Sequence, residues 1–134
     1  MTGIDDPRAS YWDETYRQYW EKRVEEAGTD TESQVQQGDA KTEGDWVYEH
    51  VFAAHPFKSG SALDVGCAWG RMFPIYQSKG LRVSGVDIST AMIQAAKSNY
   101  EGVPGIEQLD VSTAELLPFK NQSFDNLICV AVFD

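Results

Sequence analysis

The sequence has 134 residues, 42% of them hydrophobic, a length that suits one packed domain and is too short for two of ordinary size. It carries 21 acidic and 11 basic residues, for a formal net charge of −10. This charge argues against sequence-independent binding of DNA or RNA, which needs a basic surface, and against docking on anionic lipid. We therefore expect no nucleic-acid partner and no membrane partner.

The acidity lies mainly in the N-terminal part of the chain. Residues 1–50 contain 13 acidic and 5 basic side chains, whereas residues 51–134 contain 8 and 6. This distribution favours a solvated helical face and a linker over an acidic docking surface. There is no 18-residue apolar run and no basic, apolar leader, and both cysteines lie in apolar surroundings typical of reduced thiols. We expect a cytoplasmic protein.

A helix is predicted over residues 11–27. Ser10 and Asp13 fit a capping box, and Gly28 is suited to end the helix. Asp13 and Arg17 have the spacing of an i,i+4 ion pair. Aromatic residues recur at helical spacing, which we interpret as packing against the main domain, with a lid over a ligand site as the alternative. These aromatic residues are Trp12, Tyr16, Tyr19 and Trp20.

Residues 29–44 are polar, with Val35 as the one aliphatic residue larger than alanine, and this composition predicts a loop or flexible linker. Asp45 then has the position of a cap for a short helix. The predicted organisation is an N-terminal helical cap and linker over residues 1–44, followed by the main domain over residues 45–134.

Four short apolar segments alternate with helical patterns after residue 60. This alternation predicts an α/β fold with a parallel sheet and flanking helices. The last segment is almost continuously apolar, as is typical of a strand buried on both faces. The predicted strands cover residues 62–65, 81–86, 106–109 and 124–133, and the predicted helices lie between Gly70 and Gly80, after Ser89, and over residues 113–117.

Glycines follow the first predicted strand. Gly66 and Gly70 lie in the turn into the next helix, where small residues let a ligand approach the backbone N–H groups. A dinucleotide-binding loop would have glycine at positions 66, 68 and 71, but this chain has Ala68 and Arg71. The pattern therefore weighs against NAD or FAD.

Aspartates lie near the carboxyl ends of three successive predicted strands. Asp87 follows the glycines by about 20 positions, where an acidic side chain can accept hydrogen bonds from ribose hydroxyls. Asp64 and Asp110 occupy similar places on the first and third strands. One such aspartate is more often a helix cap or turn former, but three in register indicate a ligand site.

Four motifs in this part of the chain carry a family resemblance. Residues 63–70, 86–92, 110–119 and 123–125 read LDVGCAWG, VDISTAM, DVSTAELLPF and SFD. In this order they resemble the motifs of class I S-adenosylmethionine-dependent methyltransferases of the small-molecule type. The resemblance implies a Rossmann-like sheet of seven strands ordered 3-2-1-4-5-7-6, of which this chain holds the cofactor-binding half.

The resemblance implies S-adenosylmethionine as the cofactor and no metal. Asp64, Gly66 and Gly70 would shape the pocket for the methionine part, with Asp64 holding the amino group directly or through water. Val130 would line the same side, and the family's middle glycine is Ala68 here.

For the adenosine part, the resemblance implies that Asp87 binds the ribose hydroxyls and Ile88 packs on the adenine. Asp110 and the backbone of Val111 would read the adenine edge. The complete implied cofactor-binding set is Asp64, Gly66, Cys67, Gly70, Asp87, Ile88, Asp110, Val111 and Val130.

The implied function is methyl transfer to a small-molecule acceptor. Displacement at a sulfonium methyl depends largely on alignment, and a general base is needed only for a protonated acceptor. The sequence identifies no catalytic residue, although Tyr11, Tyr16 and His50 are candidates to reach the site. The alternative function is a cofactor-binding or dimerising half-domain without activity of its own. A nicotinamide oxidoreductase is disfavoured by the glycine pattern.

The chain ends at Asp134, just after the fourth predicted strand, whose apolar sequence would form an unprotected sheet edge. Three explanations remain open. The sequence is a fragment of a longer methyltransferase, another chain completes it, or two copies pair through this strand. We favour the fragment, with self-association through the fourth strand as the next alternative.

Overall fold

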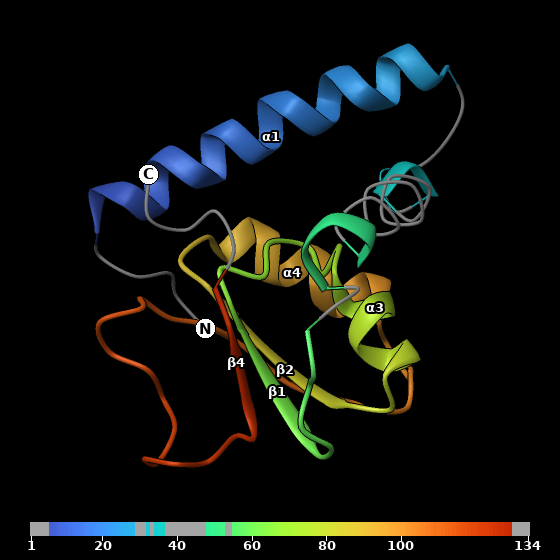
Figure 1. The fold of residues 1–134 in the computed structure, drawn as a ribbon. Helices are drawn as coiled ribbons and strands as arrows, with labels where there is room; N and C mark the ends of the chain where they lie inside the picture. The colour runs from blue at the N-terminus through green and yellow to red at the C-terminus, as the bar shows by residue number, and fades with distance from the viewer. Residues whose placement is uncertain (1–5, 29–31, 33, 37–47, 53–54, 130–134) are drawn as a thin grey trace.

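The computed structural model of the chain describes residues 6–28, 32, 34–36, 48–52 and 55–129. Their centre is a parallel four-stranded sheet in the order β3-β2-β1-β4 (Figure 1). The strands are β1 (Ser61–Val65), β2 (Arg82–Asp87), β3 (Ile106–Val111) and β4 (Asn126–Ile128). The predicted α/β class and Rossmann-like strand order are confirmed.

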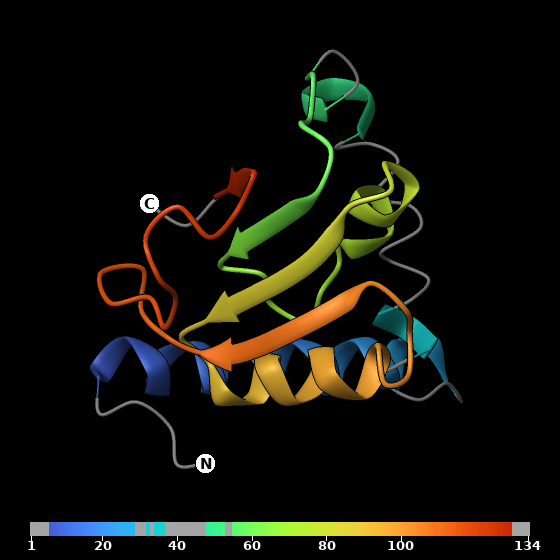
Figure 2. The same ribbon diagram turned by 90° about the horizontal axis from the view of Figure 1, so that it is seen from below.

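Helices cover one side of this sheet. The long helix α1 (Pro7–Ala27) lies along α4 (Thr90–Asn99), and α3 (Phe73–Ser78) follows the turn after β1 (Figures 1 and 2). A short π-helix, η1 (Tyr48–Phe52), precedes β1. None of the helices in the described residues is long and apolar enough to span a bilayer.

The core explains why the sheet forms here. All five residues of β1 are buried, as expected of a central parallel strand covered on both faces. On the helical face, Phe73, Tyr76 and Ile93 pack against Ala62 and Val83. The opposite face carries Leu63, Val65 and Val86, against which the loop residues Leu117, Phe119 and Phe124 pack.

The register of the strands brings their carboxyl ends together. Val65 of β1 lies beside Val86 of β2, and Asp87 of β2 lies beside Val111 of β3. Ligands of open α/β sheets bind at this edge, where the strand order reverses, which here is between β1 and β4. The fold therefore places the glycine turn and the strand-end residues around one crevice.

The predicted start of the first helix is wrong. The helix begins at Pro7, because the Asp6 side chain accepts the Arg8 backbone N–H at 2.9 Å and Pro7 supplies a favourable first position. The predicted Asp13–Arg17 ion pair is also absent from the described contacts of Arg17. Its guanidinium pairs instead with Glu14 and Glu21.

Two further predictions of local structure are wrong. Residues 113–117 form turns rather than a helix, because Ser112 Oγ donates to the carbonyls of Thr113 and Leu116 and Leu116 remains 80% exposed. Residues 32 and 34–36 are helical rather than part of a loop or flexible linker, and Val35 and Gln36 are buried. Asp45 lies outside the described residues.

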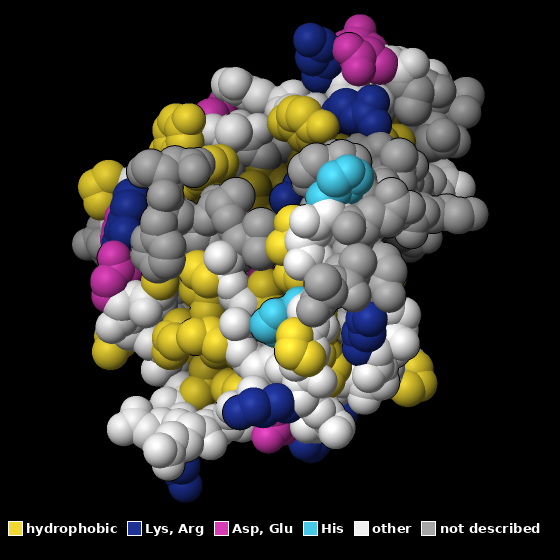
Figure 3. Space-filling view, viewed as in Figure 1, with side chains coloured by type: hydrophobic (Ala, Val, Ile, Leu, Met, Phe, Trp, Pro, Cys, Tyr) yellow, Lys and Arg dark blue, Asp and Glu magenta, His cyan; other side chains and the backbone are white. Residues whose placement is uncertain are grey.

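The fourth strand is shorter and more exposed than predicted. It covers Asn126–Ile128, and Leu127 is 67% exposed instead of buried. Within the described sheet β4 pairs with β1 alone, so it forms an edge, and Figure 3 shows hydrophobic side chains gathered at the surface around it. Residues 130–133 of the predicted strand lie outside the described residues. Self-association through this edge stays a prediction.

Replacing Gly70 by alanine should destabilise the fold more than replacing Gly80. Both glycines have left-handed backbones, with φ of 86° and 72°. A Cβ at position 70 would lie 2.6 Å from Tyr100 Cε2 and 2.8 Å from Phe73 Cδ2, whereas position 80 has nothing within 4 Å. We expect Gly80→Ala to lower the free energy of unfolding by ~1–2 kcal/mol, and Gly70→Ala by a further ~1–3 kcal/mol. If urea titrations gave equal losses in the free energy of unfolding for the two variants, the close packing around Gly70 would be contradicted.

Candidate functional site

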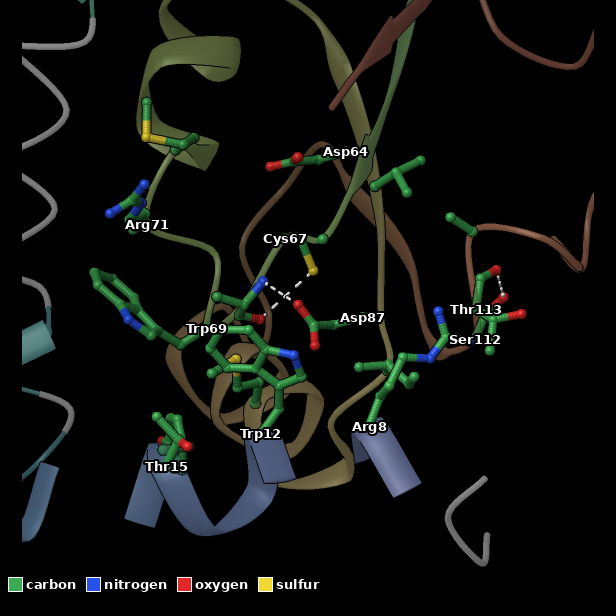
Figure 4. Close-up of a pocket in the computed structure, with 18 of the residues that line it drawn as sticks. Arg8, Trp12, Thr15, Asp64, Cys67, Trp69, Arg71, Asp87, Ser112 and Thr113 are labelled. Atoms are coloured by element: carbon green, nitrogen blue, oxygen red, sulfur yellow. Dashed lines mark hydrogen bonds between the residues drawn. The ribbon is translucent and has the colours of Figure 1, made fainter. Parts of the chain in front are cut away.

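A pocket of about 460 Å³ lies at the carboxyl ends of β1 and β2, beneath α1 (Figure 4). Its volume is in the range of small-molecule sites. It is lined by the end of β1 and the turn after it, the end of β2, Met92 of α4, residues 112–115 after β3, and one face of α1. The pocket thus lies at the carboxyl edge of the sheet, over β1 and β2, and no residue of β4 lines it.

The turn after β1, residues 66–70, is called the glycine loop below. Gly66, Ala68 and Gly70 all have positive φ, of 79°, 52° and 86°. The loop is fastened to β2, because the N–H groups of Gly66 and Cys67 donate to the Val86 carbonyl at 2.8 and 3.0 Å. A left-handed alanine is uncommon, so the hydrogen bonds around it have to hold it in place.

Asp87 supplies one of those hydrogen bonds. Its Oδ2 accepts the Ala68 N–H at 2.9 Å, and its Oδ1 accepts the Ser89 N–H at 2.9 Å. The side chain is 8% exposed and lines the pocket. Burial raises the pKa of the Asp87 carboxyl, and the backbone N–H groups partly oppose this rise. The carboxylate therefore shapes the glycine loop and also faces the cavity.

Asp64 is the second buried carboxyl group of the site. It is 4% exposed, lines the pocket, and accepts a hydrogen bond from the Tyr76 hydroxyl at 3.1 Å. Burial raises its pKa to about 7, with the charge of Asp87 adding to the rise and the hydroxyl of Tyr76 and the charge of Arg71 opposing it. A cationic group bound nearby would favour the ionised form.

The structure brings together five of the residues that the sequence predicted for the site. Gly70, the last residue of the glycine loop, lies close to Tyr100 and Phe73 and is outside the pocket lining. Asp110 and Val111 are also outside the lining, whereas the next residues along the chain, Ser112 and Thr113, form part of it. Val130 lies outside the described residues. The five that line the pocket are Asp64, Gly66, Cys67, Asp87 and Ile88.

Sequence reasoning missed most of the contribution of α1. This helix presents Arg8, Trp12, Thr15, Tyr16 and Tyr19 to the pocket, at helical spacing. The aromatic stripe was the available signal. Its predicted packing against the main domain is confirmed, and its role as a lid over a ligand site stays a prediction. Trp20 packs edge-on against Trp69 at 5.6 Å, while the exposed indole of Trp12 faces the cavity (Figure 4).

Of the three side chains that the sequence suggested could reach the site, one does so. Tyr16 lines the pocket, but its hydroxyl is hydrogen-bonded to Glu32 and accepts from Gln36 at 2.9 Å. Burial raises the pKa of Tyr16, which disfavours the phenolate form that a base needs. Tyr11 and His50 lie outside the lining and are exposed.

Comparison with known proteins establishes the family. Residues 63–134 match the family model described as a methyltransferase domain. The match covers more than half of the chain, and the chain belongs to this family. Among solved structures, the PH0226 protein from Pyrococcus horikoshii OT3 is 26% identical, with a TM-score of 0.56 over 65% of this chain and 38% of its own.

The fold is also shared with magnesium protoporphyrin IX methyltransferase from Synechocystis PCC 6803, solved with bound SAH. That structure is 24% identical, with a TM-score of 0.55 over 92% of this chain and 57% of its own. These likenesses confirm the Rossmann-like fold of class I methyltransferases.

Curated relatives match the same region. A ubiquinone biosynthesis O-methyltransferase from Paracidovorax citrulli is 30% identical over 81 residues, which are 59% of this chain and 34% of the relative. The uncharacterized protein MJ1252 from Methanocaldococcus jannaschii is 36% identical over 83 residues, 61% of this chain and 30% of its own. The chain spans about a third of the length of these relatives.

Asp64→Asn should stabilise the ligand-free protein at pH 8 and have little effect at pH 4. The folded-state pKa of Asp64, about 7, exceeds the ordinary value of 3.8, so the folded protein retains a proton that the unfolded chain releases. Stability is therefore lost as pH rises from 4 to 7, and the isosteric amide removes this loss. We expect a gain of roughly 2–4 kcal/mol at pH 8.

Urea unfolding at the two pH values measures this difference. Glu107→Gln, on the exposed surface of β3, serves as the control for loss of one negative charge. A gain that is the same at both pH values, or equal to that of the control, would show that Asp64 carries no burial cost.

Proposed function

We propose that the chain binds S-adenosylmethionine in this pocket and takes part in methyl transfer to a small-molecule acceptor. The observation that carries the proposal is the joint placement of Asp64, Asp87 and the left-handed glycine loop around one cavity at the carboxyl ends of β1 and β2. Membership of the methyltransferase domain family supports the same assignment. The cap over residues 1–44 and the domain over residues 45–134 would then form one site.

The chemistry of the pocket residues fits the parts of this cofactor. The Asp87 carboxylate, already oriented by two backbone N–H groups, can accept hydrogen bonds from ribose hydroxyls. The buried Asp64 carboxylate suits the ammonium group of the methionine part, since a cation offsets the cost of its burial. Ile88 offers an apolar surface to the adenine, and Ser112 and Thr113 also line the pocket.

Bound S-adenosylmethionine would supply a sulfonium methyl group to an acceptor nucleophile by in-line displacement. The task of the chain is then to hold the reactants in line and to exclude water. Aromatic side chains of α1 cover the cavity, which suits that task. Since the Tyr16 hydroxyl is engaged with Glu32 and Gln36, we assign no general base among the described residues.

The alternative is a cofactor-binding or dimerising half-domain without turnover of its own. Two observations favour testing it: the chain spans about a third of its curated relatives, and Leu127 of the edge strand β4 is exposed. A labelled-methyl assay with candidate acceptors separates the two functions. Sedimentation of the same sample shows whether the chain self-associates.

Calorimetry with S-adenosylhomocysteine tests the proposal directly, with NAD as the comparison ligand. We expect binding of S-adenosylhomocysteine and none of NAD. Binding of NAD without binding of S-adenosylhomocysteine would overturn this proposal and favour a nicotinamide oxidoreductase.

Asp87→Asn should weaken S-adenosylhomocysteine binding by about 1–3 kcal/mol, the usual range for a hydrogen bond to a charged group. The amide keeps an oxygen for one backbone N–H but loses the negative charge toward the ribose. Titration calorimetry measures the change, and Glu107→Gln again controls for net charge. An unchanged dissociation constant would show that the Asp87 carboxylate does not contact the ligand.

A further inference from the structure

Asp13 makes contacts outside its own helix. Its Oδ1 accepts a hydrogen bond from Ser89 Oγ at 2.5 Å and another from the Ala91 N–H at 3.1 Å. Ser89 is the N-cap of α4, and its Oγ also accepts the Met92 N–H at 3.2 Å. A carboxylate at a helix N-terminus is favourably placed, because the N–H groups there lack helical partners. Asp13 thereby joins α1 to α4.

The contact between Asp13 and Ser89 is connected to the pocket through Asp87. Ser89 is fully buried, and its backbone N–H donates to Asp87, the carboxylate that faces the cavity. Trp12 precedes Asp13 on α1, and successive helical residues point about 100° apart. One turn of α1 therefore directs Asp13 onto α4 and Trp12 into the pocket beside Asp87 (Figure 4).

The other attachments of this part of α1 are an exposed ion pair and apolar packing. Arg8 pairs with Glu115 across the pocket at 2.9 Å, but both side chains are more than half exposed, and such pairs contribute little. Trp20 packs on Trp69 two turns further along the helix. Tyr16, one turn from Trp12, is buried in a cluster with Trp20 and Trp69. The partly buried bonds of Asp13 add the polar restraint that lies nearest Trp12.

We propose that Asp13 is a positioning residue for the cofactor site: by binding Ser89 and Ala91 it holds α1 where Trp12 closes the pocket over Asp87. The inference rests on the proposed function. The indole of Trp12 is 40% exposed without ligand and offers a flat apolar surface to the adenosyl group. Its value for binding depends on orientation, which Asp13 supplies.

A double-mutant cycle tests this dependence. Asp13→Ala and Trp12→Ala should each weaken S-adenosylhomocysteine binding about tenfold. The double variant should have the same affinity as the single variant that binds more weakly, because the two residues act through one contact. Asp13→Asn keeps an acceptor oxygen and should restore most of the affinity. Glu14→Ala is the matched control, since Glu14 pairs with Arg17 and Gln18 on the helix surface and should leave affinity unchanged.

Amide hydrogen exchange of the ligand-free protein tests the hydrogen bonds by which Asp13 joins α1 to α4. Asp13→Ala should speed exchange of the Ala91 N–H, while the amides of β2 keep their protection, which separates loss of the anchor from unfolding. If the wild type binds and Asp13→Ala binds equally well, or if the two single losses add fully, the positioning role is wrong. If the wild type fails to bind S-adenosylhomocysteine, the proposed function fails first and this inference falls with it.

Discussion

The site depends on two hydrogen bonds that the Asp87 carboxylate accepts from backbone N–H groups. One of them, from Ala68, holds the glycine loop in its left-handed form, and the other, from Ser89, orients the first turn of α4. Because Ser89 in turn binds Asp13, a single carboxylate at the end of β2 connects the loop, α4 and α1. The cavity is the space that these three elements leave above the sheet. Its shape is therefore set by hydrogen bonds rather than by apolar packing alone.

Burial of the carboxyl groups in the site destabilises their ionised forms. Two carboxyl groups, Asp64 and Asp87, line one pocket, where burial raises the pKa of both and the charge of Asp87 raises that of Asp64 further. The ligand-free fold tolerates them because Tyr76 donates to one and backbone N–H groups donate to the other. A pocket of this kind is electrostatically incomplete, and a positively charged ligand is the natural complement. This is the physical link between the stability of the protein and its proposed cofactor.

Much of the sheet and part of the site could be predicted from the sequence, for identifiable reasons. The strands alternate with helices in a local pattern, and Ser89 caps α4 through a contact three residues away, as the pattern indicates. The contacts that the sequence did not predict are long-range. Asp13 has the spacing to pair with Arg17, but α4 lies close enough to bind it instead. Likewise, the burial of Gln36 was not predicted, since two of its three hydrogen-bond partners, Tyr16 and Asn99, lie far away in the chain.

The docking of α1 also bears on the order in which the chain is synthesised. The aromatic face of α1 is translated first, yet Trp20 meets Trp69, and Asp13 meets Ser89, only after another 49 and 76 residues have been added. At ~5–20 residues per second, these partners arrive several seconds after the helix. During that interval the aromatic side chains of α1 have no native surface to cover, so this face of the helix stays exposed until Trp69 and Ser89 have been added.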